Sequence, residues 1–139
     1  MFVTAFAFAE TAKAPLDSLL LANDIAIQDN TFVFSVTDGV NPNDPKILVG
    51  IYATKYGVSY NELYKVILCE SNFNNLARGL AGEIGIAQFM PNTWNRFNQI
   101  RETELNIYNV EDQLDMVSWA FQHKLKSNWT CYRKLVTSS

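Results

Sequence analysis

The sequence predicts a single, mainly α-helical domain, and three observations lead to that prediction. Ser59 is followed three residues later by Glu62, which is the capping-box pattern at the start of a helix. Asp44 precedes Pro45, so a good N-cap stands before a proline at the first helical position. Residues 110–124 repeat apolar side chains at the spacing of one helix face. The chain has 139 residues, of which 48% are hydrophobic, and this is enough for one core.

Residues 1–9, MFVTAFAFA, are apolar and aromatic and end in the small-x-small pattern Ala7-Phe8-Ala9. They lack the positively charged start of a complete secretory signal, so we predict a partial signal peptide and export to the cell envelope or the outside. A buried strand and an apolar start without a special role are the alternatives. A membrane-spanning helix needs about 20 consecutive apolar residues, and the sequence contains no such stretch.

Residues 10–44 are predicted to form an arm or linker before the folded domain. Within them, Leu16–Ile27 has the pattern of a short helix. Thr31–Val36 has the composition of a strand, which Asp38-Gly39 would end. The folded domain is therefore expected to span residues 45–139.

The helix that follows the capping box carries an acidic residue where its apolar face predicts a core side chain. Leu63, Val66 and Ile67 lie at i, i+3 and i+4 on that face, and the next residue, at i+7, is Glu70. Burial disfavours the charged form of a carboxylate, so we expect the pKa of Glu70 to be raised. The alternative is that Glu70 turns outward at the helix end or pairs with a base such as Arg78.

A glycine-punctuated loop comes next, because Gly79, Gly82 and Gly85 recur at three-residue intervals after the asparagine-rich residues 72–75. Such a loop can adopt left-handed conformations and bring backbone amides close to a ligand. It could also contain a small β-hairpin. Pro91 is well placed to start the helix that follows.

Charge and metal-ligand patterns exclude two classes of function. The net charge is −3 and no basic stripe is present, so no nucleic-acid partner is predicted. The one histidine, His123, has no cysteine, histidine or acidic cluster at ligand spacing. No metal site is predicted, and the oligomeric state cannot be inferred.

Two blocks of residues carry a family resemblance. They are Glu70-Ser71 with Phe73-Asn74, and Gly85-Ile86-Ala87-Gln88 with Met90-Pro91 and Thr93. Together they resemble the lytic transglycosylase domain of the lysozyme-like superfamily, whose pattern is Glu-Ser, then Gly-Leu-Met-Gln, then Met-Pro. The resemblance runs from Asp44 to Trp129. It implies a lysozyme-like α domain with catalytic function at residues 45–139, and it brings no cofactor.

The resemblance also implies a role for each matched residue. Glu70 would be the catalytic acid. The residues implied in binding substrate are Ser71, Gln88, Ile86, Phe89 and Met90, and Ser71 and Gln88 could instead orient the acid. The implied substrate is peptidoglycan, cut at the β-1,4 bond between N-acetylmuramic acid and N-acetylglucosamine. The implied product carries a 1,6-anhydro ring.

Two other functions stay open. A hydrolytic lysozyme needs a second carboxylate, for which Glu83 is the candidate, unless Glu83 is simply a solvated loop residue. A catalytically inactive glycan-binding or cell-wall module is the other alternative. It is kept open by the lack of the family's later tyrosine, whose position falls near Ala120 and Phe121.

The chain has two cysteines, Cys69 beside Glu70 and Cys131 near the end. In an exported protein an even number of cysteines favours a disulfide, and this one would close a loop of about 60 residues. Two buried free thiols are the alternative. Because the first residues predict export, the bridge is the favoured prediction.

Overall fold

The computed structural model describes residues 26–28, 31–33 and 41–138. In order, its elements are β1 (Ala26–Gln28), β2 (Thr31–Val33), α1 (Pro45–Tyr56), α2 (Tyr60–Ser71), α3 (Pro91–Arg101), α4 (Val110–Gln122), the short 3-10 helix η2 (Lys126–Asn128) and α5 (Thr130–Thr137). The prediction of a mainly helical domain is confirmed. The predicted signal segment, residues 1–9, lies outside the described residues.

The helices of the domain begin where local sequence signals place them. The side chain of Asp44 accepts a hydrogen bond from the Lys46 amide at 2.8 Å, directly before Pro45. The Ser59 hydroxyl oxygen accepts from the Glu62 amide at 3.3 Å, as a capping serine does. These caps satisfy amides that have no partner inside the helix, so they fix the starts of α1 and α2.

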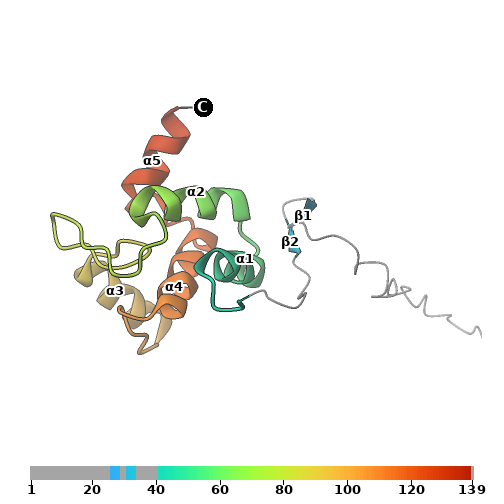
Figure 1. The fold of residues 1–139 in the computed structure, drawn as a ribbon. Coiled ribbons are helices and arrows are strands. Elements are labelled where there is room, and N and C mark those ends of the chain that lie inside the picture. The colour runs from blue at the N-terminus through green and yellow to red at the C-terminus, as the bar shows by residue number, and fades with distance from the viewer. Residues whose placement is uncertain (1–25, 29–30, 34–40, 139) are drawn as a thin grey trace, which may run out of the picture.

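The core lies where α1, α2 and α4 meet, with the segment before α3 packed against it. Figure 1 shows α1 and α4 lying together below α2, while α3 flanks α4. The fully enclosed core side chains are Val49, Leu63, Val66, Ile67, Ile86, Phe89, Phe97, Leu114, Met116 and Val117. Burying such side chains is the main favourable term in folding, so the site described below rests on the most tightly packed part of the domain.

One buried carboxylate, Asp115 of α4, links three helices. Its Oδ1 accepts hydrogen bonds from the Tyr56 hydroxyl, at 2.9 Å, and from the Lys55 ammonium. Its Oδ2 pairs with the Arg101 guanidinium at 2.6 Å. Burial alone would raise the pKa of Asp115, but the hydrogen bonds from Lys55, Arg101 and Tyr56 outweigh it and hold that pKa below its usual value.

The last helix, α5, differs from the sequence prediction, which ended the helical pattern at residue 124. α4 ends at Gln122, and after η2 the chain forms the eight-residue helix α5. Its start has no side-chain cap, and Cys131 is its one buried residue. The apolar residues Tyr132, Leu135 and Val136 lie at i, i+3 and i+4, but the segment is short and no capping residue precedes it, so the helix was not predicted. α5 contacts α2 and projects from the body of the domain (Figure 1).

The predicted arm contains a small antiparallel pair of strands. β2 falls within the predicted strand Thr31–Val36, and it pairs with β1 so that Ala26 lies opposite Val33. Residues 26 and 27 were predicted as the end of a short helix, and that prediction is wrong for these two because they pair with β2. The rest of that predicted helix lies outside the described residues. β2 contacts α1.

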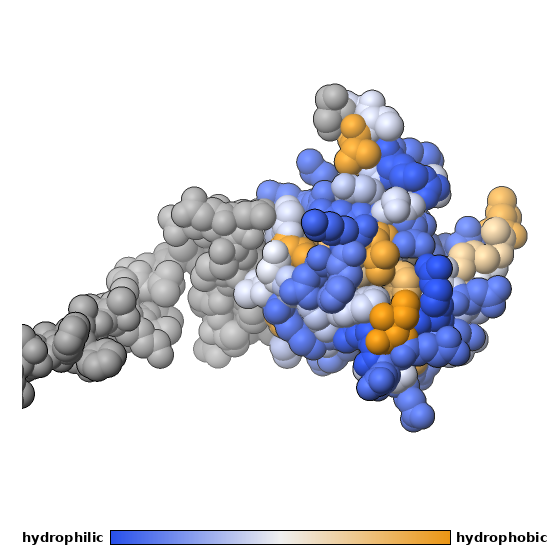
Figure 2. Space-filling model, turned by 180° about the vertical axis from the view of Figure 1, so that it is seen from behind, coloured by the Kyte–Doolittle hydropathy of each residue, from blue (hydrophilic) through white to orange (hydrophobic). Residues whose placement is uncertain are grey.

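The face seen in Figure 2 is largely hydrophilic, with small and separate hydrophobic patches. The glycine-rich loop between α2 and α3 contributes two highly exposed leucines, Leu76 and Leu80. Within the described residues, no helix is long and apolar enough to span a membrane.

Candidate active site

Glu70 lies one residue before the C-terminal end of α2, at the end of the buried stripe of that helix. Its side chain is half-buried and turns toward the start of α5. Its Oε1 accepts a hydrogen bond from the backbone amide of Cys131 at 3.1 Å. In the part of the chain that the structure describes, this is the hydrogen bond that Glu70 makes.

The pKa of Glu70 is raised above its usual value, as its place on the apolar stripe predicts. Burial is the largest cause, because it disfavours the carboxylate form. The Cys131 amide lowers the pKa, the negative charge of Glu83 raises it, and Lys134 and Arg133 lower it. The net shift is upward, so Glu70 can hold its proton at a higher pH than an exposed glutamate.

The loop segment of residues 85–88 is held from three directions, one of them Ser71, the residue after Glu70. The Ser71 hydroxyl donates to the Ile86 carbonyl at 2.6 Å. The Trp129 indole N–H donates to the Ala87 carbonyl at 2.8 Å. The buried side chain of Gln113 accepts from the Ala87 amide at 2.9 Å. Since all three hydrogen bonds go to the backbone, the segment is positioned regardless of its side chains.

The close approach of Gln113 explains why a glycine stands at position 85. Gly85 has a φ of +78°, and a Cβ at this position would lie 2.1 Å from Gln113 Nε2. The same Nε2 donates to the carbonyls of Ile84, at 3.2 Å, and Ile107. The Gln113 side chain thus bonds backbone groups of the loop that would otherwise need partners in regular secondary structure. Ile84 adds isolated antiparallel bridges to Arg78 and Phe89.

The structure separates the implied substrate-binding residues into two groups. Ile86 and Phe89 are 0% and 2% exposed, so they belong to the core and could meet a glycan only through backbone atoms. Met90 is 38% exposed and Gln88 is half-buried, so their side chains remain accessible. Ser71 lies next to Glu70, but its hydroxyl is committed to the Ile86 carbonyl.

The Gln88 side chain bonds its own loop and does not hydrogen-bond Glu70. Its side-chain amide donates to the Gly85 carbonyl at 2.7 Å, and its φ of +50° is unusual for a residue other than glycine. Backbone strain of this kind collects at functional sites, where the surrounding structure holds it in place. Here two features hold the backbone of Gln88 in this conformation: the hydrogen bond to the Gly85 carbonyl and the burial of the neighbouring Phe89.

Glu83, the candidate second carboxylate, folds back over its own loop. Its Oε2 accepts from the Ala81 amide at 3.1 Å. A Cβ on Gly79 would lie 2.0 Å from the same oxygen, so the carboxylate occupies the space that a side chain at position 79 would need. Glu83 is close enough to Glu70 to influence its pKa, but its local bond ties it to the loop.

The two tyrosines that flank α4 do not supply the family's missing side chain. Tyr108 is exposed beside the loop, where the Arg78 guanidinium lies 5.7 Å from its ring centre. Tyr132 packs against Phe121, with ring centres 6.0 Å apart. Within residues 41–138, the hydrogen bond to Glu70 comes from a backbone amide and not from a tyrosine hydroxyl.

Cys69 and Cys131 form a disulfide, with their Cα atoms 5.9 Å apart. The bridge joins the residue before Glu70 to the residue whose amide bonds Glu70. It therefore ties the end of α2 to the start of α5 on the same side as the carboxyl group.

Sequence reasoning missed three groups at this site: the Gln113 side chain, the Trp129 indole and the Cys131 amide. Gln113 could have been found by the logic that found Glu70, because it is a polar residue next to the apolar face of a helix. Trp129 and the Cys131 amide depend on α5, whose short apolar pattern at Tyr132, Leu135 and Val136 the sequence analysis did not use.

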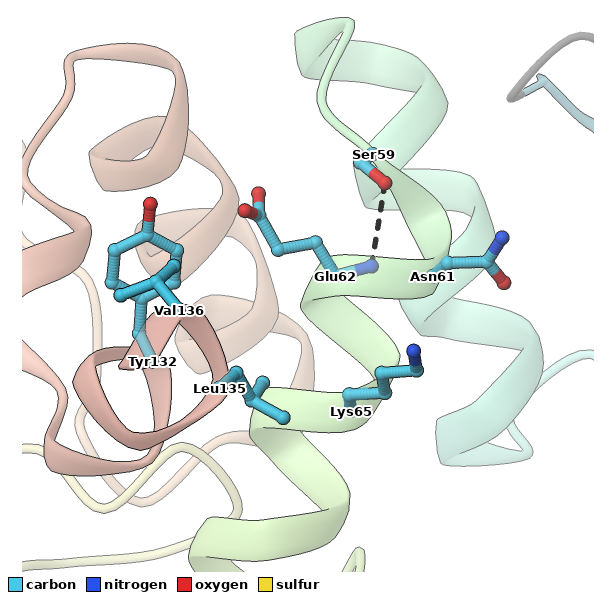
Figure 3. Close-up of a pocket in the computed structure, with 7 residues that line it drawn as sticks. All are labelled: Ser59, Asn61, Glu62, Lys65, Tyr132, Leu135 and Val136. Atoms are coloured by element: carbon cyan, nitrogen blue, oxygen red, sulfur yellow. Dashed lines mark hydrogen bonds between the residues drawn. The ribbon is translucent and has the colours of Figure 1, made fainter. Parts of the chain in front are cut away.

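A cavity of about 290 Å³ lies beside the first half of α2, away from Glu70. Figure 3 shows Glu62 of α2 and Tyr132 of α5 facing the space between the two helices. Its lining residues are Ser59, Asn61, Glu62, Lys65, Tyr132, Leu135 and Val136, and none of the site residues above is among them. In the described residues, no group of three or more histidine, cysteine and acidic residues could hold a metal ion.

Comparison with protein families gives a match to the model of the transglycosylase SLT domain over residues 47–136, more than half of the chain. The match runs from within α1 to within α5 and contains Glu70 and the glycine-rich loop. No curated protein and no solved structure matched the chain.

Proposed function

Because the chain belongs to the transglycosylase SLT domain family, we propose that it is a lytic transglycosylase that cleaves peptidoglycan glycan strands. The bond cut is the β-1,4 link between N-acetylmuramic acid and N-acetylglucosamine, and no water is consumed. The observation that carries this proposal is the state of Glu70: half-buried at the end of an apolar stripe, with a raised pKa and with Oε1 oriented by a backbone amide.

A single carboxyl group can perform both proton transfers of this reaction. Protonated Glu70 donates to the leaving glycosidic oxygen as the bond from that oxygen to the anomeric carbon breaks. The muramic C6 hydroxyl oxygen then bonds to the anomeric carbon and gives its proton to the Glu70 carboxylate. The product is a 1,6-anhydro ring, and Glu70 ends protonated, ready for the next cycle.

The arrangement of charges favours this intramolecular route. Glu83 is the acidic residue that acts on the pKa of Glu70, but its Oε2 accepts from the Ala81 amide, which directs this oxygen to its own loop. The C6 hydroxyl is tethered to the reacting sugar, which gives it a large effective concentration. Attack by that hydroxyl needs one acidic residue, Glu70, whereas hydrolysis needs a second carboxylate.

Hydrolysis is the second candidate, because the charge of Glu83 reaches Glu70. Hydrolytic enzymes of this class place their two carboxyl groups about 5 to 9.5 Å apart, depending on stereochemistry. A swing of the Glu83 side chain away from the Ala81 amide would be needed for it to take this part.

Product analysis by mass spectrometry tests the proposal. Digested peptidoglycan should give 1,6-anhydromuropeptides, which are one water lighter than hydrolysis products and have no reducing end. Reducing muropeptides alone would replace the proposal by hydrolysis. No soluble product, together with retained binding to peptidoglycan, would indicate the inactive cell-wall module.

Export is part of the same proposal, because peptidoglycan lies outside the cytoplasm. The disulfide between Cys69 and Cys131 supports it, since such bonds form and persist in oxidising compartments. The binding partner in this proposal is the glycan strand of peptidoglycan, which is also the substrate.

A further inference from the structure

The amide that bonds Glu70 belongs to the least secured helix of the domain. Cys131 is the second residue of α5, and its N–H lies 3.1 Å from Glu70 Oε1. The first amides of a helix lack partners inside the helix and carry a partial positive charge. A carboxylate at this position is therefore both oriented and stabilised by α5.

α5 has little of its own to hold it in place. An isolated helix of eight residues is marginal in water. Cys131 is its one buried residue, while Tyr132 and Leu135 are half-buried against the core. Three attachments hold its first turn: the Trp129 indole at the Ala87 carbonyl, the packing of the Tyr132 ring on Phe121, and the disulfide to Cys69.

Of these attachments, the disulfide acts on the amide most directly. Trp129 precedes Cys131 by two residues and leaves the direction of the following helix free. The bridge fixes Cys131 itself, against the residue that precedes Glu70. The bridge thus links Cys131, the donor of the hydrogen bond, to Cys69, the residue next to the acceptor Glu70.

We propose that Cys131 is a positioning residue for Glu70, and that its bridge to Cys69 makes cleavage by this domain depend on the oxidised state. The inference rests on the proposed function, since it concerns the same acid. It assigns to α5 the orienting role for which this chain has no tyrosine at positions 120 and 121.

The redox step is an ordinary exchange with a dithiol. A dithiol reductant gives two electrons and two protons to the Cys69–Cys131 bond, which becomes two thiols, while the reductant becomes its own disulfide. Cys69 lies on an exposed part of α2, so the bridge can be approached from solvent. The reduced domain would keep its core but lose the fixed position of the first turn of α5.

Loss of that position changes the environment of Glu70. The charged groups that act on Glu70 are Glu83 from the loop and Arg133 and Lys134 from α5. The Cys131 amide and both basic residues lower the pKa of Glu70, and all three move with α5. Burial, the largest cause of the raised pKa, also changes when α5 moves, so the pKa of Glu70 should differ between the reduced and the oxidised protein.

The experiment compares the oxidised protein, the protein treated with dithiothreitol, and the double variant Cys69→Ala/Cys131→Ala. Turnover of purified peptidoglycan should be about 10-fold to 100-fold lower in kcat for the last two, as expected when an acid is misplaced by about 1 Å. KM should change little, because Ser71 and Gln113 hold the loop without the bridge. Dithiothreitol should have no effect on the double variant, which serves as the matched control for the reagent.

A titration of the Glu70 carboxyl carbon by NMR gives a readout that a purely structural role of the bridge would not move. The carboxyl should titrate at a different pH in the reduced protein than in the oxidised one. Equal titration and equal kcat in both states would overturn the inference. If the oxidised protein cleaves nothing, the proposed function fails, and this titration still decides the positioning role.

A further measurement covers the case in which the reduced protein unfolds. In the oxidised protein, the amide proton of Cys131 should shift with pH in step with Glu70, and Glu70→Gln should abolish that shift. A Cys131 amide that ignores the titration of Glu70 would overturn the inference without any need for a reduced sample. Val136→Ser, at an exposed position on the same helix, should leave both the shift and the activity unchanged.

Discussion

Glu70 and Asp115 are two carboxylates of one small domain, both withdrawn from water and with opposite outcomes. Asp115 is surrounded by Lys55, Tyr56 and Arg101, and its pKa is lowered. Glu70 has a single backbone donor, and its pKa is raised. The difference shows that burial does not decide what a carboxylate does. The hydrogen-bond and charge partners of a buried carboxylate decide whether it is ionised and stabilises the fold or stays protonated and can donate a proton.

The largest effect should follow from Glu70→Gln. The amide keeps the shape of the side chain but cannot donate or accept the proton, so turnover of peptidoglycan should fall by about 10²-fold to 10⁴-fold. Folding should be retained, which circular dichroism and thermal unfolding can check. Activity above about a tenth of the wild-type value would remove Glu70 from its role.

The corresponding change at the other carboxylate, Asp115→Asn, should do the reverse. It leaves Arg101, whose side chain is 12% exposed, without a charged partner, and should cost about 3 kcal/mol in the free energy of unfolding. The rate per folded molecule should stay at the wild-type level. A denaturant midpoint equal to that of the wild type, or a lost rate in a fully folded sample, would contradict this division of roles.

The loop between the two sites can be tested with a pair of glycine variants. Gly85→Ala combines a φ of +78° with a clash against Gln113, whereas Gly82→Ala has a φ of +94° and open space around it. Both should lose about 1 to 3 kcal/mol through backbone strain. Only Gly85→Ala should also lower kcat, because only it displaces the backbone beside Glu70. Equal kcat values for the two would show that Gln113 does not position the site.

The pH dependence separates the carboxylates without any mutation. Asp115 stabilises the fold above its unfolded pKa of about 3.9, and this stability should be lost as the pH falls toward its lower folded pKa. Glu70 has the opposite sign: its protonated form favours the fold, and its ionisation costs stability as the pH rises through the raised pKa.

Activity should therefore fall as the pH rises through the pKa of Glu70, while the stabilising contribution of Asp115 is lost in acid. A pH–rate profile combined with denaturation at each pH checks both limbs. Glu70→Gln should raise the free energy of unfolding at neutral pH. A rate that still increases at alkaline pH would mean that the protonated form of Glu70 does not start the reaction.

The smallest effect is expected for Glu83→Gln. The amide can still accept the Ala81 hydrogen bond, so the loop should keep its shape. Loss of the negative charge lowers the pKa of Glu70, which should move the alkaline limb of the activity profile to lower pH. The maximal rate should change by less than about tenfold, since typical acid–base residues contribute more than this. A complete loss of activity would instead favour the hydrolytic mechanism.

Local signals in the sequence predicted the parts of the fold that are built locally. Asp44, Ser59 and Asn109 each accept a hydrogen bond from an amide of the first turn of the helix that they precede, and these helices begin as their caps require. The stripe that ends at Glu70 predicted both its partial burial and its raised pKa. These features need only neighbouring residues, so they can be read from one chain.

The rest of the site depends on contacts between distant residues. Gln113 reaches Ala87 across 26 positions, and the Cys131 amide reaches Glu70 across 61. Ile86 and Phe89 were implied as substrate-binding residues by their motif, but the motif cannot show that their side chains point into the core. α5 is held mainly by tertiary contacts, and the sequence analysis did not predict it.

The disulfide also acts on the unfolded chain, where none of these contacts exist. Cys69 and Cys131 are 62 positions apart, so the bridge closes a ring that contains the acid, the glycine-rich loop, α3 and α4. In the chain-entropy description, such a ring removes disordered conformations worth about 4 kcal/mol. The catalytic half of the domain thus begins each refolding event already confined. α1 lies outside the ring, so the disulfide does not confine it before it packs against α4.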